Sequence, residues 1–278
     1  MKKIVAIGGG FIGEINDLGV KQSYETGLFD REIVKLSNTL NPNLLFIGLA
    51  EVNYSDLYFE FIKEVYEKKY GCNCKNLKTK DLNNKYKLEE YFKWADIFYV
   101  GGGNTYNLMN YLTTYQLDNM LIDASNQGKV MSGISAGGMC WFKYGNSIIR
   151  PNPKLIKQKC LGLENIIFVP HCDEVNGHFE NVENMLANEN MVAISLSNCC
   201  ALEIVDDKYR FLVEDGSRYN ITPFALKSFW LDGKYYINEL NVNQLFKPLS
   251  DLTSIYDNNK DISSNIRKLL RKRNIYFK

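Results

Sequence analysis

The chain has 278 residues, of which 45% are apolar and 23% charged, a balance typical of a soluble globular protein with a substantial core. Its 33 basic and 32 acidic side chains nearly cancel, which argues against a general affinity for nucleic acid or an anionic membrane. No apolar run approaches the roughly 18 to 20 residues of a membrane helix. Glycines also interrupt the first apolar run too early for a signal peptide. We therefore expect a cytoplasmic protein without nucleic-acid or membrane partners.

Cysteine and histidine usage gives no sign of a metal site. The seven cysteines are scattered and include no CxxC pair, and the chain has only two histidines. Without an export signal the cysteines are expected to be reduced thiols. We predict no metal and no cofactor.

Short apolar runs alternate with segments of helical period through the first two-thirds of the chain. Each run is bounded by glycine, proline or polar residues and predicts a buried strand; the runs are 3–7, 44–48, 97–100, 130–132 and 166–169. Helices are predicted between them at 30–38, at 55–70 with Ser55 as N-cap, and at 104–127. This alternation predicts an α/β fold with a mostly parallel sheet and helices on both faces. In such folds ligands bind at the carboxyl ends of the strands.

The pattern changes after about residue 200. Residues 202–213 and 228–239 are typical of antiparallel strands, and the second pair turns at the hairpin signal of residues 231–234. Residues 264–278 predict a short basic helix. We expect an α/β domain at 1–205 and a C-terminal extension at 206–278, a β-hairpin and a basic helix packed on the same domain.

The first glycine-rich strand end is GGGFIG at residues 8–13, which matches the GxGxxG pattern of dinucleotide-binding folds. That fingerprint requires the last glycine to open a helix. The residues that follow show little helical period, so a nucleotide-binding enzyme is disfavoured. We instead assign Gly9 and Gly10 to the border of a substrate pocket.

The second glycine-rich strand end is GGGNT at residues 101–105, between the strand IFYV and a helical stretch. Successive glycines at the start of a helix present free backbone N–H groups and allow a ligand to approach closely. An ordinary tight turn would have the same sequence. Asn104 and Thr105 are candidate pocket residues.

The third is GISAG at residues 133–137, which satisfies G-x-S-x-G directly after a strand. In that motif the serine occupies a strained strand-to-helix turn with its hydroxyl exposed, and the glycines relieve crowding. Ser135 is therefore the candidate nucleophile. The N–H of Ala136, with that of Gly102 or Gly103, would form an oxyanion hole.

A serine nucleophile needs a base, and the two candidates are His171 and His178. His171 directly follows the strand at 166–169 and its proline, so it also stands at a carboxyl strand end. His178 has the sequence surroundings of a loop or helix start. An α/β-hydrolase places its acid before a histidine that stands late in the chain, whereas His171 follows Ser135 by only 36 residues, so that fold is disfavoured.

Together these motifs resemble a known family. GGGNT at 101–105, GISAGGMCWF at 133–142 and PHCDE at 170–174, in this order, are similar to the peptidase E family of serine peptidases. That family includes cyanophycinase and has the flavodoxin-like fold of class I glutamine amidotransferases. The resemblance covers roughly residues 1–205 and implies that Ser135 is the nucleophile, His171 the base and the glycine-loop N–H groups the oxyanion hole. It implies a dipeptidase-like serine peptidase that forms an acyl-enzyme.

The sequence departs from the family where the third triad member is expected. Family members carry an acid after the serine turn or after the histidine, but the corresponding segments here, 145–149 and 193–202, lack it at Ile148, Ser197 and Asn198. Three alternatives stay open. Asn198 orients His171 through its carbonyl oxygen; Asp173 or Glu203 substitutes for it; or the protein is a weak or inactive member that binds a small ligand. Asn198 comes first because of its position.

The charge of the substrate can also be predicted. Peptidase E proper favours an N-terminal aspartyl residue, and binding its carboxylate calls for Arg or Lys. Between His171 and Lys208 there is no lysine or arginine, whereas this stretch contains Asp173, Glu174, Glu180, Glu183 and Glu189. We expect a neutral or basic small peptide as substrate and leave a homodimer open.

Overall fold

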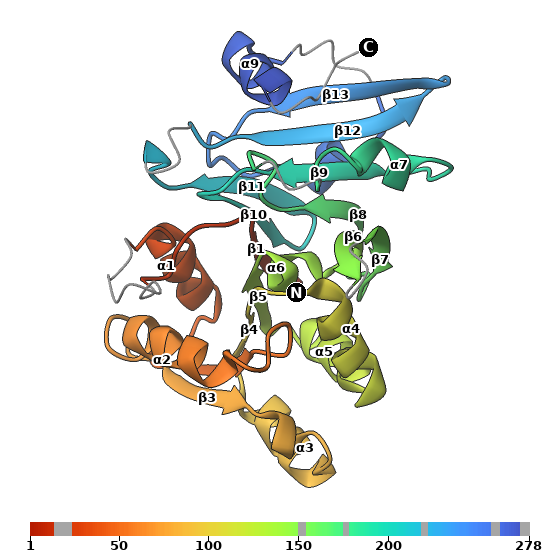
Figure 1. Cartoon of the computed structure of the whole chain (residues 1–278). Helices are drawn as coiled ribbons and strands as arrows, with labels where there is room; N and C mark the ends of the chain where they lie inside the picture. The colour runs from red at the N-terminus through yellow and green to blue at the C-terminus, as the bar shows by residue number, and fades with distance from the viewer. Residues whose placement is uncertain (14–23, 150–153, 175–177, 218–221, 257–261, 273–278) are drawn as a thin grey trace.

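Two β-sheets make up the framework of the molecule. A computed structural model describes residues 1–13, 24–149, 154–174, 178–217, 222–256 and 262–272. The first sheet lies between two layers of helices, and the second sheet packs across it at the side of β1 and β10 (Figure 1). Among the described helices, none is long and apolar enough to cross a membrane.

The first sheet has the strand order β14-β11-β10-β1-β5-β4-β2-β3. Its parallel strands are β1 (Lys3–Ile7), β2 (Asn43–Ile47), β3 (Asn73–Leu77), β4 (Ile97–Val100) and β5 (Val130–Ile134). On the other side of β1, the strands β10 (Cys200–Val205), β11 (Lys208–Val213) and β14 (Lys247–Pro248) each pair antiparallel to their neighbours. The parallel half confirms the predicted α/β pattern, because the first four predicted strands lie in it.

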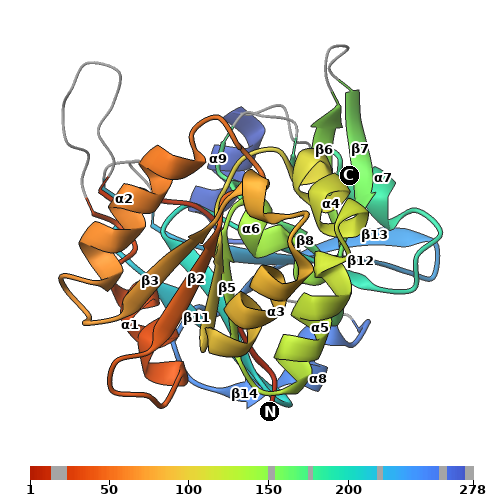
Figure 2. The ribbon, with the colours of Figure 1, turned by 90° about the horizontal axis from the view of Figure 1, so that it is seen from below.

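Helices cover both faces of this sheet, as expected for right-handed crossovers between parallel strands. α1 (Gly27–Leu36) and α2 (Ser55–Tyr66) pack on one face, and α3 (Lys85–Trp94), α4 (Thr105–Thr114) and α5 (Leu117–Asn126) pack on the other (Figure 2). A single 3-10 turn, Thr79–Asp81, precedes α3.

Three helix predictions need correction. α1 begins at Gly27 and not at residue 30, and the N-cap of α2 is Tyr54, so that Ser55 is already helical. The helix predicted at 104–127 is two helices, because Gln116 has a φ of 58° and breaks the run. A left-handed residue cannot continue a right-handed helix.

The second sheet has the order β13-β12-β9-β8-β6-β7. Its strands are β6 (Phe142–Ile149), β7 (Lys154–Lys159), β8 (Glu164–Val169), β9 (Val192–Leu196), β12 (Ala225–Leu231) and β13 (Lys234–Leu240). β6, β8 and β9 are parallel, and β7, β12 and β13 pair antiparallel to their neighbours. The strand predicted at 166–169 is therefore present, but it lies in this sheet and not beside β5.

The C-terminal region continues both sheets. The hairpin predicted at 228–239 is confirmed: β12 and β13 turn at Asp232 and Gly233, which have φ values of 50° and 74°. β10 and β11 join the first sheet, so the predicted boundary after residue 205 falls in the turn between them. The predicted basic helix is present as α9 (Ser264–Lys272), and residues 273–278 lie outside the described residues. Two shorter helices, α7 (Val182–Leu186) and α8 (Leu249–Thr253), lie in the same half of the chain.

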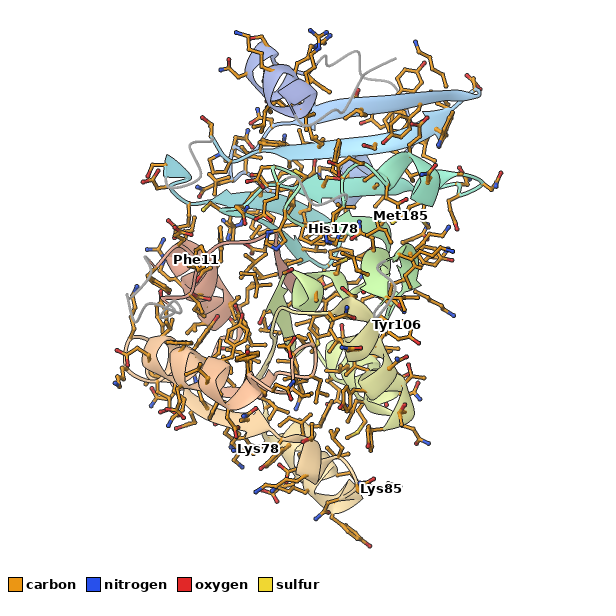
Figure 3. The ribbon with its side chains drawn as sticks, viewed as in Figure 1. Phe11, Lys78, Lys85, Tyr106, His178 and Met185 are labelled. Atoms are coloured by element: carbon orange, nitrogen blue, oxygen red, sulfur yellow. The ribbon has the colours of Figure 1, made fainter. Side chains whose placement is uncertain are left out.

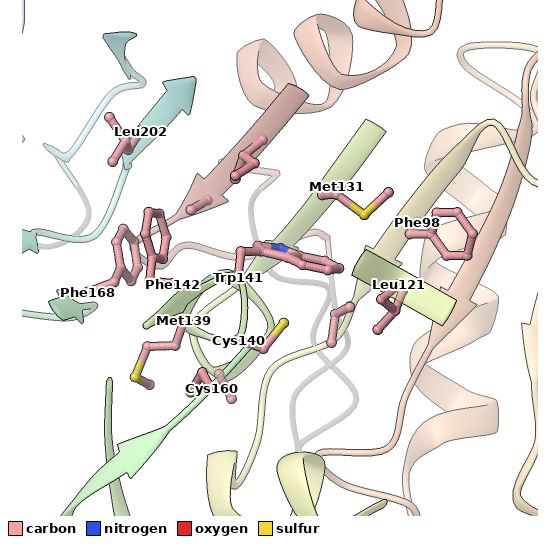
Figure 4. Packing of buried hydrophobic residues seen from close by; sticks show 14 of the residues in the cluster. Phe98, Leu121, Met131, Met139, Cys140, Trp141, Phe142, Cys160, Phe168 and Leu202 are labelled. Carbon is pink, nitrogen blue, oxygen red and sulfur yellow. The ribbon is translucent and has the colours of Figure 1, made fainter. Parts of the chain in front are cut away.

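The helix that carries the serine motif is anchored in the core between the sheets. α6 (Ala136–Met139) is short, and Met139, Trp141 and Phe142 at its end are at most 2% exposed. Phe142 stacks on Phe168 of the second sheet, with ring centroids 4.7 Å apart (Figure 4). Because α6 also contacts β1, β4 and β5 of the first sheet, the turn before it is held by packing on both sheets.

Candidate active site

Ser135 occupies a sharp turn between β5 and α6. Its φ of 55° and ψ of −117° lie in a region that L-residues rarely adopt. Gly133 and Gly137 make this turn sterically feasible, because a Cβ there would lie 2.5 Å and 2.0 Å from the carbonyl oxygen of Val100. The Ser135 N–H donates to the carbonyl of Ile7 at 3.0 Å and ties the turn to β1. The G-x-S-x-G geometry predicted from sequence is thus present.

His171 and Asn198 meet Ser135 at this turn. His171 follows β8, and its Nε2 lies 3.0 Å from Ser135 Oγ. Asn198 lies between β9 and β10, and its Oδ1 lies 3.0 Å from His171 Nδ1. The three side chains come from three different strand ends and form one continuous hydrogen-bonded chain.

Two carboxylates orient the Asn198 amide. Asp173 Oδ1 accepts the Asn198 backbone N–H at 2.7 Å, and Asp173 Oδ2 accepts Asn198 Nδ2 at 3.0 Å. Glu174 Oε1 accepts the same Nδ2 at 2.8 Å and lies 3.2 Å from His171 Nδ1. With its nitrogen directed at carboxylates, the amide can only turn its oxygen toward the imidazole.

The carboxylates also determine the charge state of His171. Burial is the largest influence and lowers its pKa, but the hydrogen bond and charge of Glu174, the Asn198 bond and the charge of Asp173 together raise it above its ordinary value. These groups therefore favour the imidazolium form of His171.

Backbone N–H groups are available beside the serine. The Gly101 N–H donates to the carbonyl of Ile47, whereas no hydrogen bond in the described part of the chain uses the N–H of Gly102, Gly103 or Ala136. A Cβ on Gly102 would lie 3.5 Å from the Ser135 Cβ, so this loop borders Ser135. Gly102 and Ala136 thus lie beside Ser135, whereas a Cβ on Gly103 would face Ala50, and the oxyanion hole stays a prediction.

The glycine loop after β1 lies directly against the histidine. A Cβ on Gly9 would lie 2.6 Å from His171 Nδ1 and 2.0 Å from Asn198 Oδ1. The carbonyls of Gly8 and Gly9 accept the backbone N–H groups of His171 and Cys199. Gly10, with a φ of 133°, faces the segment of Glu25. Residues 14–23, on which the nucleotide-binding alternative depended, lie outside the described residues.

The two other predicted pocket residues begin α4. Asn104 caps this helix by accepting the Asn107 N–H, and its Nδ2 donates to the carbonyl of Ile148 in β6. Thr105 is 2% exposed. The Asn104 side chain is therefore committed to joining α4 to β6, and its contact with a substrate stays a prediction.

His178 lies close enough to the site for the charge of His171 to act on it. Its Nδ1 lies 2.5 Å from Asn146 Oδ1, and Asn146 Nδ2 donates to the His178 carbonyl. Burial, followed by the charge of His171, lowers the pKa of His178 to about 4. Sequence reasoning missed Asn146, because an Asn within a strand carries no signal of its own. Figure 3 labels His178 near the second sheet, Tyr106 near the start of α4 and Phe11 on the side of α1.

The position of Glu203 excludes this carboxylate as the group that orients His171. It accepts a hydrogen bond from Arg210 Nε at 2.7 Å, and Arg210 also binds Glu32, so its carboxylate belongs to an ion-pair cluster. A cavity of about 650 Å³ between β3 and α3 shares no residue with the serine site. Among the described residues, no group of three or more His, Cys, Asp or Glu side chains is arranged to hold a metal ion.

The model of peptidase family S51 matches residues 19–212, which is more than half of the chain. The chain belongs to peptidase family S51. It is therefore a serine-type peptidase, a hydrolase, as the resemblance implied. The S51 chain is 26% identical over 212 residues to YgaJ of Bacillus subtilis, which is described as an uncharacterized peptidase. The aligned region covers 75% of this chain and 85% of YgaJ.

Solved structures support the S51 fold. A peptidase from an acI-B1 Actinobacterium is similar with a TM-score of 0.64 at 17% identity, covering 89% of this chain and 96% of its own. A protein from Listeria monocytogenes EGD-e, named as a candidate peptidase E, has a TM-score of 0.55 at 18% identity. The match covers 77% of this chain and 100% of the Listeria chain. These likenesses confirm the α/β fold class.

The pKa values of the two histidines of this S51 chain should differ widely. A titration followed by ¹⁵N-histidine NMR should show His171 above its ordinary value of about 6.5 and His178 near 4. Because Glu174 raises the pKa of His171, Glu174→Gln should lower it. A general base must be neutral, so the acid limb of the activity profile should move to lower pH in this variant. A Glu174→Gln variant with unchanged or raised His171 pKa would contradict this account.

Proposed function

We propose that this peptidase hydrolyses small peptides, in the manner of a dipeptidase, with Ser135 as nucleophile, His171 as general base and Asn198 as the third member. The observation that carries the proposal is the continuous chain of contacts, from Ser135 Oγ to His171 Nε2 at 3.0 Å and from His171 Nδ1 to Asn198 Oδ1 at 3.0 Å. Nucleophile, base and orienting group are thus each within hydrogen-bond reach of the next.

Acylation begins when Ser135 Oγ attacks the peptide carbonyl and its proton passes to His171 Nε2. The carbonyl oxygen becomes an oxyanion beside the N–H groups of Gly102, Gly103 and Ala136. Losing one such donor costs roughly 10²–10³ in turnover in serine peptidases of other folds, so unused donors beside Ser135 are a substantial catalytic resource. His171 then protonates the leaving amine, and water hydrolyses the acyl-enzyme by the same route in reverse.

The missing triad acid need not abolish this chemistry. Replacing Asp by Asn in a serine triad can cost about 10⁴ in turnover because the wrong histidine tautomer is favoured. Here the Asn198 nitrogen already donates to Asp173 and Glu174, so its oxygen faces Nδ1 and favours the tautomer with a proton on Nδ1. Negative charge is also supplied, because Glu174 lies 3.2 Å from the same nitrogen.

Carboxylates around the site favour a neutral or basic substrate over an aspartyl peptide. Burial, and after it the nearby charges of Glu25, Asp173, Glu214 and Asp215, raise the pKa of Cys199, next to Asn198, to about 12. A substrate carboxylate would meet this negative potential, whereas an ammonium group would be attracted.

None of the seven cysteines, all within the described ranges, forms a disulfide, which supports the proposed cytoplasmic setting.

A fluorophosphonate should label the protein on Ser135, because an activated serine attacks this electrophile. Intact-mass spectrometry should show one adduct in the wild type and in Ser37→Ala, a control at the end of α1, and none in Ser135→Ala. Asn198→Ala should slow labelling by at least about tenfold, because the imidazole loses its orienting acceptor. A folded wild-type protein that takes up no label would instead favour a ligand-binding member of the fold.

The charge preference can be measured with two dipeptides. Lys-Leu and Asp-Leu differ in the N-terminal side chain, so their relative kcat/KM reports the potential at that position. We expect Lys-Leu to be cleaved at least as fast as Asp-Leu, with the difference shrinking as salt is added. Cleavage confined to Asp-X dipeptides would overturn the substrate assignment while leaving Ser135 as nucleophile.

A further inference from the structure

We propose that Asp173 is a positioning residue, which acts by holding the Asn198 amide in the one orientation that lets His171 act as a base. This inference rests on the proposed function, since it assigns the residue that orients the third triad member. An asparagine side chain has an acceptor at one end and two donors at the other, so its orientation decides what it offers to a neighbour.

The two orientations of Asn198 have opposite consequences for His171. With Oδ1 toward the imidazole, Nδ1 must carry the proton, and Nε2 has a lone pair for the Ser135 hydroxyl. With Nδ2 toward the imidazole, Nδ1 would be the acceptor and Nε2 would carry the proton. A protonated Nε2 in neutral imidazole cannot accept the serine proton, so the second orientation is inactive.

Asp173 supports only the active orientation. Its residue is 2% exposed, and both carboxylate oxygens bind Asn198, one through the backbone N–H at 2.7 Å and one through Nδ2 at 3.0 Å. A reversed amide would place Oδ1 against this buried carboxylate, with two acceptors and no proton between them. The hydrogen bond to the Asn198 backbone N–H also fixes the position of the main chain from which the side-chain amide extends.

Glu174 is less suited to this role. It makes one hydrogen bond to Nδ2, and its side chain is 44% exposed, so water can replace that contact. Glu174 acts mainly through charge on His171, whereas Asp173 determines geometry. The pair therefore offers a matched comparison between adjacent carboxylates.

Asp173→Asn tests the proposal with minimal disturbance. The new Oδ1 can still accept the Asn198 backbone N–H, but the new amide nitrogen faces Asn198 Nδ2, donor against donor, and favours reversal of the Asn198 amide. We expect kcat for Lys-Leu to fall by at least about tenfold, with KM within about threefold, because the wrong tautomer is favoured. Glu174→Gln should retain a larger share of kcat at pH values where His171 is neutral.

A spectroscopic signal reports the orientation without any substrate. The chain has only two histidines, so ¹⁵N-histidine spectra distinguish the two neutral tautomers of His171, and His178→Gln assigns the signals. The wild type and Glu174→Gln should show the Nδ1–H tautomer, and Asp173→Asn should show the Nε2–H tautomer. This signal is independent of turnover, so it separates failure of the positioning role from failure of the proposed peptidase reaction.

The double variant Asp173→Asn/Asn198→Asp provides the rescue. A carboxylate at 198 accepts the Nδ1 proton in only one way, and the amide at 173 can donate to it, so the Nδ1–H tautomer should return and kcat should exceed that of Asp173→Asn severalfold. If Asp173 merely supported the loop, the double variant would be no better than the single one. An Asp173→Asn protein with wild-type tautomer and kcat would overturn the proposal, as would a folded double variant without rescue.

Discussion

The backbone conformation at Ser135 is the constraint on which the rest of the site depends. A φ of 55° at a non-glycine residue costs about 1–3 kcal/mol and persists only where the surroundings enforce it. Here Gly133 and Gly137 allow close contact with β4, and burial of Met139 and Phe142 beyond the turn contributes about 1.5–3 kcal/mol for each side chain. Packing therefore outweighs the strain, and the strain directs the Ser135 hydroxyl toward His171.

A positive φ at a non-glycine residue also occurs at the other two strand ends of the site. His171 and Cys199 have φ values of 50° and 58°, and each lies just beyond a strand of the second sheet. Their backbone N–H groups donate to the Gly8 and Gly9 carbonyls at the end of β1, which belongs to the first sheet. The glycine loop thus joins the two sheets at the point where His171 and Ser135 meet. A side chain at Gly9 would occupy the space of the imidazole and the Asn198 amide, so the glycine is required by close approach.

Local patterns predicted the parts of this site, and long-range packing decided how they are assembled. The strand ends, the serine turn and His171 follow from short motifs, because each motif specifies its own backbone geometry. The placement of β8 in a second sheet was not predictable, since periodicity indicates a buried strand without naming its neighbour. Asn198 was predicted from its position. Its hydrogen bonds to Asp173 were not, because they form only where the loops after β8 and β9 lie side by side. The left-handed Gln116 that divides the helix predicted at 104–127 carried no clear sequence signal.

Covalent catalysis by Ser135 is the central claim, and trapping the acyl-enzyme tests it most directly. An aminoacyl p-nitrophenyl ester mixed rapidly with the protein should release a burst of about one nitrophenolate per chain before the steady state. Acid quenching and peptide mass spectrometry should then find the aminoacyl group on Ser135, and Ser135→Ala should show neither burst nor adduct. Steady hydrolysis of dipeptides and of the ester with no burst and no acyl group on Ser135 would contradict the claim, because water would then attack the substrate directly.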